Sequence, residues 1–153
     1  MTPPRWFTAR RLSVLAAAGV AIAVVAYLAA PLFLMPAVEE AVPAGFALVA
    51  KAGAWVGADD FHFASGLAKL LTDGRGNYVL RLENFSVRNG PDIEFFLSAD
   101  ADYNADDVRL GQVTATVGSY SVPIPRGTDI EAIHYAIIWC VPFSVLFATA
   151  RLA

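Results

Sequence analysis

One cysteine and two histidines are the residues in this sequence whose chemistry could define a site. Cys140 is the only cysteine, so no disulfide can form within the chain and no multi-cysteine metal centre is available. A thiol can instead undergo redox chemistry or ligate a prosthetic group such as haem. The structural alternative is a small apolar core residue, because cysteine is among the most buried residue types.

The two histidines differ in their value as partners for Cys140. His134 lies six residues before it in the same expected strand, roughly 20 Å away at the rise of an extended chain, which is too far for a catalytic pair. The distance between His62 and Cys140 depends on how the chain folds, because the two residues are far apart in the sequence. His62 is therefore the candidate second cofactor-binding residue, with a hydrogen-bonded structural histidine as the alternative. Two histidines also exclude a three-histidine metal site, and we expect no metal ligands.

The acidic segment 100–107 resembles the start of a calcium-binding loop. It has Ala105 where an EF-hand requires glycine and Gly111 where it requires glutamate, so the EF-hand interpretation fails. A solvated acidic loop is the simpler interpretation, and a weak cation site is the alternative. The sequence contains no nucleophile elbow, P-loop or zinc motif. It therefore carries no hydrolase, kinase or transferase signature. Whether the protein is an enzyme stays open, and a redox or electron-transfer component is the possibility that remains.

Turn signals recur every 8–15 residues after residue 45, with β-branched and aromatic runs between them. This pattern predicts an all-β domain, an antiparallel β-sandwich of about eight strands. The expected strands are residues 54–58, 67–72, 78–87, 93–97, 113–117, 120–124, 133–140 and 143–148. The expected core residues are Leu80, Leu82, Phe85, Val87, Ile93, Phe95, Ile138 and Phe147.

The expected strand 78–87 changes its alternation midway. Leu82 and Phe85 belong to apolar sets of opposite parity, so one straight strand cannot bury both. We therefore expect a β-bulge or bend near Glu83 and Asn84.

The expected strand 133–140 is almost continuously apolar, which indicates a central strand covered on both faces. Cys140 ends this strand just before Val141 and Pro142, on the face opposite Trp139. We therefore expect Cys140 near one end of the sandwich, where a ligand could reach it.

Residues 12–34 form an uncharged apolar run of 23 residues that predicts one N-terminal transmembrane helix, a signal anchor. A cleaved signal peptide is the alternative, but its apolar core is typically only about 7–15 residues long. Three arginines precede the run, which places residues 1–11 in the cytoplasm and the C-terminal domain on the extracytoplasmic side. Residues 35–44 then form a linker, and residues 45–153 form the exported domain.

The charge balance bears on possible partners. The net charge is −3, and beyond the three N-terminal arginines the chain has 8 basic and 14 acidic residues. An acidic domain without a basic stripe is a poor candidate for nucleic-acid binding, so we expect no nucleic-acid partner. The apolar content of 57% excludes a disordered chain.

Four segments in this order resemble the DM13 domain, and the resemblance covers residues 45–153. They are FHFASG at 61–66, YVLRLENF at 78–85, NGPD with FLS at 89–98, and IWCVPFSVLF ending in ARL at 138–152. The resemblance implies an all-β module, distantly related to DOMON-type sandwiches, for electron transfer or oxidative modification at cell surfaces. It also implies that Cys140, which matches the cysteine of the closing motif, is a redox residue, as a bare thiol or as a haem ligand.

Two functions are therefore open. The first is a membrane-anchored extracytoplasmic redox or electron-transfer module that uses Cys140 and meets a redox partner protein in the cell envelope. The second is a non-catalytic binding or structural module of the envelope with a packed Cys140. If Cys140 is functional, an apolar site without a nearby cation favours ligation of a prosthetic group over free-thiol chemistry.

Overall fold

The computed structural model describes residues 14–25 and 37–153, and the chain divides into two compact units, Met1–Leu34 and Met35–Ala153. Residues 14–25 are helical, and their side chains are exposed. Within the two described ranges, no helix has both the length and the apolar character that a membrane crossing requires. The transmembrane helix expected at residues 12–34 lies partly outside these ranges.

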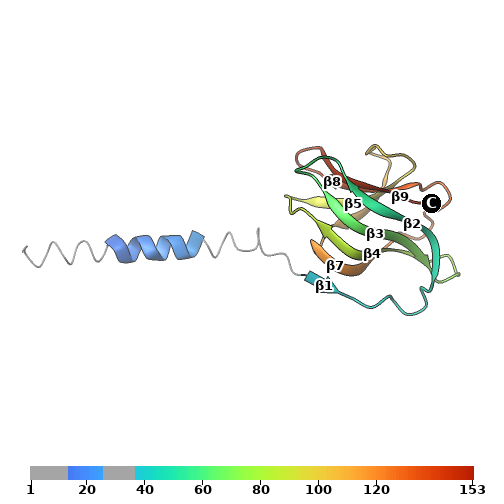
Figure 1. Ribbon diagram of the computed structural model, residues 1–153, viewed down its shortest axis with the longest axis horizontal. Helices are drawn as coiled ribbons and strands as arrows, with labels where there is room; N and C mark the ends of the chain where they lie inside the picture. Colours follow the sequence, from blue (N-terminus) through green and yellow to red (C-terminus); the bar gives the residue numbers. More distant parts are fainter. Residues whose placement is uncertain (1–13, 26–36) are drawn as a thin grey trace, which may run out of the picture. The chain divides into compact units, whose positions relative to one another are not determined.

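Residues 37–153 contain nine strands that form one sheet in the order β1-β7-β4-β3-β2-β9-β8-β5-β6 (Figure 1). The parallel pair β1 and β7 is the exception in an otherwise antiparallel sheet. The strands are β1 (Ala37–Glu39), β2 (Leu48–Gly57), β3 (Ala64–Thr72), β4 (Tyr78–Val87), β5 (Ile93–Ser98), β6 (Val108–Gln112), β7 (Val117–Pro123), β8 (Tyr135–Cys140) and β9 (Val145–Arg151).

The all-β prediction is confirmed, but the sheet is a single curled layer instead of two separate layers. β2 pairs with β3 up to Ala54 and then with β9 from Trp55 to Gly57, so one strand belongs to both halves of the sheet. The sheet thereby curls around one core, like a half-barrel (Figure 1). Alternation along a strand shows which side chains face inward, but it does not show whether two inner faces belong to one sheet.

Several segments differ from the sequence-based expectation. β6 was not expected as a strand, and β2 begins at Leu48 instead of residue 54. Residues 37–39, expected in the linker, form β1 because their backbone pairs with that of β7. Backbone pairing requires no particular side-chain pattern. Residues 113–116 of the strand expected at 113–117 instead connect β6 to β7, which begins at Val117. Val113 and Ala115 are buried there at 4% and 0% exposure, so their apolar character reflects the core and not a strand.

All eight expected core residues are buried, and none is more than 5% exposed. Phe85 lies at the centre of this core, since its ring centroid is 5.9 Å from that of Trp55, 5.8 Å from Phe95 and 6.1 Å from Tyr120. The core therefore joins β2, β4, β5 and β7, which belong to both halves of the curled sheet.

The irregularity expected in β4 is confirmed. The pairing of β4 with β7 shifts between Leu82 and Phe85, and Asn84 adopts a positive φ of 48°. Gly66 faces this bulge with a φ of 98°, and a Cβ atom there would lie 2.5 Å from the Asn84 carbonyl oxygen. The bulge inserts an extra residue into β4, so the side chains before and after it point to the same face of the sheet. Leu82 and Phe85 are therefore both buried.

β8 is covered on both faces, as its apolar sequence predicts. Its inner side chains, including Ile138 and Cys140, belong to the core. On the outer face, Tyr103 from the acidic loop stacks on Trp139 with ring centroids 4.5 Å apart. Glu94 in the neighbouring β5 is only 1% exposed and forms an ion pair with Arg109. The acidic loop therefore covers the outer face of β5 and β8.

Candidate functional site

Cys140 lies at the end of the sheet where the chain enters it. β1 begins at Ala37 opposite Val117, which pairs with the last residues of β4. The same end contains the start of β5 and the turn that joins β8 to β9, because Cys140 pairs with Ile93 and Val145. We call this side of the domain the entry end, defined by loops 58–63, 88–92 and 113–116 and turn 141–144; the opposite side is the far end.

Loop 88–92 covers the Cys140 thiol. Cys140 is 2% exposed, and its Sγ donates a hydrogen bond to the Pro91 carbonyl oxygen at 3.1 Å. The next backbone N–H, that of Val141, donates to the Asp92 carbonyl oxygen at 3.2 Å. Any reagent that reaches the sulfur from this side must first displace the loop.

His62 lies at the same end, but its contacts are with other residues. Its Nδ1 donates to a carboxylate oxygen of Asp59 at 2.8 Å, and its ring meets the Phe147 ring edge-on at 4.8 Å. No hydrogen bond joins His62 to Cys140 in the described part of the chain. Phe147 connects the two environments, because its ring also packs against Gly90 in the covering loop.

Asp59 organises loop 58–63 and gives it a measurable pH dependence. Its carboxylate accepts the His62 imidazole and also the backbone N–H groups of Phe61 and His62 at 2.7 and 2.6 Å. These bonds, above all the one from the His62 side chain, lower the pKa of Asp59 from 3.8 to about 2. A depressed folded-state pKa stabilises the loop above pH 3.8, and this stabilisation is lost as the pH falls towards 2.

We therefore expect the Asp59 side-chain carboxyl resonance to titrate with a midpoint about 2 in an NMR titration. The His62→Ala variant should move that midpoint up towards the ordinary aspartate value, because the largest cause of the shift is removed. A midpoint near 3.8 in the unmodified chain would contradict the loop geometry.

His134 lies at the far end, which agrees with its exclusion as a partner of Cys140. It lines a hollow of about 570 Å³ together with Lys51 and Arg151. The Lys51 ammonium there donates to the carbonyl oxygens of Ile130, Glu131 and Ile133 at 2.6–3.1 Å. The hollow is thus separate from the Cys140 site.

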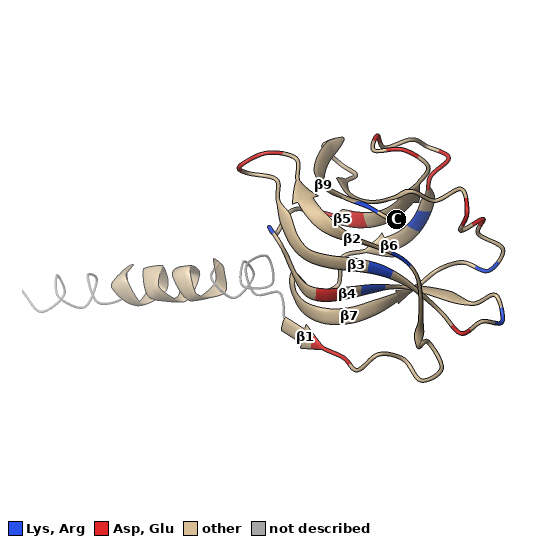
Figure 2. Ribbon diagram, turned by 45° about the vertical axis from the view of Figure 1, so that its right-hand side comes forward, with Lys and Arg blue, Asp and Glu red and all other residues tan. Residues whose placement is uncertain are grey.

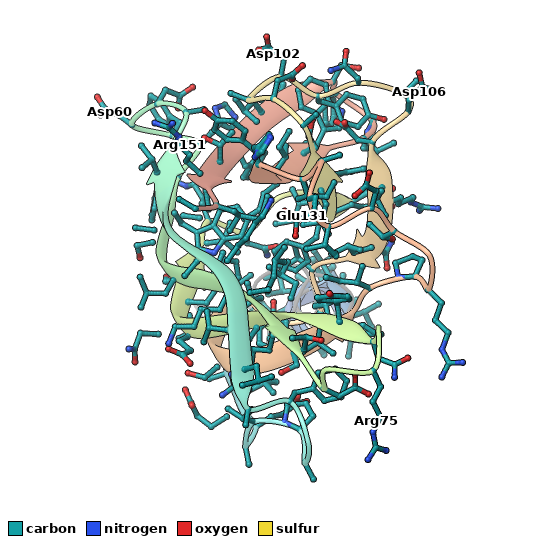
Figure 3. All side chains as sticks on the ribbon, turned by 90° about the vertical axis from the view of Figure 1, so that its right-hand side faces the viewer. Asp60, Arg75, Asp102, Asp106, Glu131 and Arg151 are labelled. Atoms are coloured by element: carbon teal, nitrogen blue, oxygen red, sulfur yellow. The ribbon has the colours of Figure 1, made fainter. Side chains whose placement is uncertain are left out.

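The acidic loop is held by bonds within itself. The Asp102 backbone N–H donates to the Asp100 carboxylate, and the Asn104 backbone N–H donates to the Asp107 carboxylate. Asp102 and Asp106 point outward (Figure 3). In residues 14–25 and 37–153, no group of three or more metal-ligating His, Cys, Asp or Glu side chains is present. Acidic and basic residues are scattered over the domain (Figure 2).

Haem ligated by Cys140 does not fit this arrangement. The hollow beside the covering loop measures only about 110 Å³ and is lined by Gly90, Asp92, Ile93, Gln112 and Val113. Ligand pockets typically measure roughly 300–1,000 Å³, and a macrocycle would need Pro91 and its neighbours to leave the sulfur. The ranking of prosthetic-group ligation above free-thiol chemistry therefore has no support from this geometry.

The close packing of Gly90 yields a prediction about access to the thiol. A Cβ atom at Gly90 would lie 2.6 Å from the Phe147 Cζ atom, and the Phe147 side chain is only 5% exposed. Gly90→Ala should therefore displace loop 88–92 and destabilise the fold by about 1–3 kcal/mol. We expect a faster reaction of Cys140 with a thiol reagent under native conditions, measured by mass spectrometry. An unchanged rate would mean that loop 88–92 does not control access.

The protein thus has an all-β domain with a single buried thiol at the end of a central strand. A family model described as "Electron transfer DM13" matches residues 58–152, well over half of the chain. The chain belongs to this DM13 electron transfer family. No curated protein and no solved structure matched it significantly. The matched range contains both Cys140 and the covering loop. Of these two, only the cysteine is recognisable from the sequence as a candidate functional residue.

Proposed function

We propose that the protein is an electron-transfer module held at the extracytoplasmic face of a membrane, with Cys140 as its redox group. The observation that carries this proposal is the position of the only cysteine, within the electron-transfer family match and under one short loop. A thiol deep inside the sheet would need global unfolding to react. Cys140 ends its strand, and the proposal requires that the release of Pro91 and its neighbours is enough to expose it.

The simplest chemistry for this thiol is exchange with a disulfide of an envelope partner protein. Cys140 loses its proton, and its sulfur attacks one partner sulfur. The S–S bond of the partner breaks, a mixed disulfide forms, and the second partner sulfur leaves as a thiolate that takes up the proton. A thiol of a second, dithiol partner then attacks the first partner's sulfur in the mixed disulfide, and Cys140 leaves as a thiolate that takes up the proton of that thiol. The other thiol of the dithiol partner attacks its own sulfur in the new disulfide between the partners, which closes an internal disulfide and releases the first partner as a thiol, so that two electrons pass between the partners.

A specific observation favours the second candidate, a binding or structural module. Cys140 is 2% exposed and belongs to the core, as expected for a thiol that only packs. The two functions differ in how the thiol becomes accessible. A redox thiol reacts through local opening of loop 88–92, whereas a packed thiol reacts only when the whole domain unfolds.

The test measures the reaction of the full chain, in a mild detergent, with oxidised glutathione and with an aromatic disulfide reagent. Cys140→Ser is the control that cannot form the mixed disulfide. Phe85→Ala destabilises the whole fold and leaves loop 88–92 unchanged in sequence. If the redox role holds, Gly90→Ala accelerates the reaction and Phe85→Ala changes the rate little. If the thiol is only packed, Phe85→Ala accelerates it about a hundredfold or more, in step with the lost stability.

The membrane location is tested separately. The apolar run 12–34 and the arginines before it support an anchor with the domain outside. A reporter active only outside the cytoplasm, fused after Ala153, should be active in the full chain. The protein should also resist extraction from membranes by alkaline carbonate. A silent reporter, or a mature chain that begins near residue 30, would overturn the anchor.

A further inference from the structure

The entry end exposes a group of aromatic side chains. Within residues 37–153, the exposed phenylalanines are Phe61 at 71%, Phe143 at 67% and Phe63 at 41%. Phe61 and Phe63 come from loop 58–63 and Phe143 from turn 141–144, so all three lie at the entry end. Burial of such side chains is favourable, and their concentration at one end indicates an interaction surface.

A cation accompanies the aromatic rings. The Arg88 guanidinium lies 5.8 Å from the ring centroids of both Phe61 and Phe63. The Arg88 backbone N–H also donates to the Phe63 carbonyl oxygen at 3.1 Å, which joins loops 58–63 and 88–92. Aromatic rings beside an arginine are characteristic of surfaces that lie at the boundary between lipid and water.

The chain itself enters the domain at this end. Only Met35 and Pro36 separate Leu34, the last residue of the apolar run, from Ala37, the first residue of β1. Three consecutive Cα–Cα steps span at most about 11 Å. If residues 12–34 cross a bilayer, the start of β1 is held within that distance of the point where the apolar run ends.

We propose that the entry end docks on the outer surface of the bilayer that holds residues 12–34. Phe61 and Phe143 insert at the level of the lipid headgroups, and Arg88 pairs with lipid phosphates. This proposal rests on the membrane anchor proposed above. Since Cys140 lies at the same end, its redox partner has to reach it at the bilayer surface.

The charges of the entry end favour neutral, zwitterionic headgroups over anionic ones. Asp59 is engaged by His62, and the Asp92 carboxylate accepts a hydrogen bond from Gln112 at 2.6 Å. Asp60 is exposed beside Phe61 and projects from the domain (Figure 3). These acids would repel an anionic surface, so aromatic insertion provides the main attraction.

The experiment places an environment-sensitive fluorophore on the full chain in phosphatidylcholine vesicles that contain a spin-labelled lipid. In a Cys140→Ser background, one variant carries the probe at Asp60→Cys and another at Arg75→Cys. Arg75 lies in the turn between β3 and β4 at the far end (Figure 3). We expect severalfold stronger lipid quenching of the probe at position 60 than of the probe at position 75.

Two double variants identify the side chains responsible. Phe61→Ser with Phe143→Ser should reduce the quenching at position 60 to the level at position 75. Leu48→Ser with Val49→Ser is the matched control, because both residues are exposed and apolar but lie at the far end, and it should leave the quenching unchanged. Circular dichroism verifies that each variant stays folded.

The possible failures are distinguishable. If the protein floats with the vesicles and resists carbonate extraction, yet positions 60 and 75 are quenched equally, the docking surface is wrong and the anchor stands. The docking is equally overturned if the phenylalanine variant keeps full quenching. If the protein leaves the vesicles in carbonate, the anchor fails and the docking fails with it.

Discussion

Replacement of Phe85 by alanine is expected to destabilise the domain by about 3–5 kcal/mol, as truncation of a fully buried aromatic residue does. Phe85 is 1% exposed and contacts the rings of Trp55, Phe95 and Tyr120. Its removal leaves a cavity that borders strands from both halves of the curled sheet. The halves have no second core in which to pack, so the loss should affect the whole domain.

Urea unfolding of the full chain, followed by far-ultraviolet circular dichroism, measures this loss. Phe61→Ala is the matched control, because Phe61 is 71% exposed and its truncation removes few protein contacts. We expect the control to remain within about 0.5 kcal/mol of the unmodified protein, as surface substitutions usually do. Equal losses in the two variants would show that Phe85 is not part of the core.

The interior of the fold was largely predictable from the sequence because burial imposes a period on each strand. Leu82 and Phe85 have opposite parity, and only an inserted residue can bury both, so the bulge at Asn84 followed from the pattern. The apolar character of residues 133–140 likewise identified β8 as covered on both faces. Both inferences depend only on residues that are close together in the sequence, so the apolar pattern of a single strand is enough to make them.

The pairing of distant segments was not predictable in the same way. β1 is three residues long and is held by backbone bonds to β7, and backbone bonds have no side-chain signature. The cover of Cys140 comes from Pro91, 49 residues earlier in the chain. The Asn-Gly-Pro-Asp turn was visible in the sequence, but nothing local connected it to the thiol.

Glu94 illustrates the limit of alternation. The pattern predicts that it points away from the core, where charged side chains are normally solvated. It does lie on the outer face of β5, but it is only 1% exposed because Arg109 and the acidic loop cover it. The signal that could have indicated this cover was Tyr103, an aromatic residue within the acidic loop, which stacks on Trp139.

Gly53→Ala is expected to destabilise the domain by at least about 3 kcal/mol, because it introduces a side chain where two backbone segments touch. A Cβ atom at Gly53 would lie 1.9 Å from the Arg151 carbonyl oxygen. Two hydrogen bonds between Ala52 and Ala153, of 3.0 and 3.1 Å, hold the end of the chain against β2 at this point. The only relief is for the two segments to separate.

The same unfolding experiment tests this prediction, with Gly127→Ala as the control. Gly127 has a positive φ of 85° but nothing within 4 Å of its added Cβ atom, so alanine there should cost only the conformational penalty of about 1–2 kcal/mol. Gly53 still pairs with β3, two residues before Trp55, where β2 begins to pair with β9. If one continuous sheet encloses the core, the clash at Gly53 opens the sheet and the larger loss follows. Equal losses for the two alanine variants would mean that β9 is not held against β2 there, and that the two halves of the sheet are separate layers.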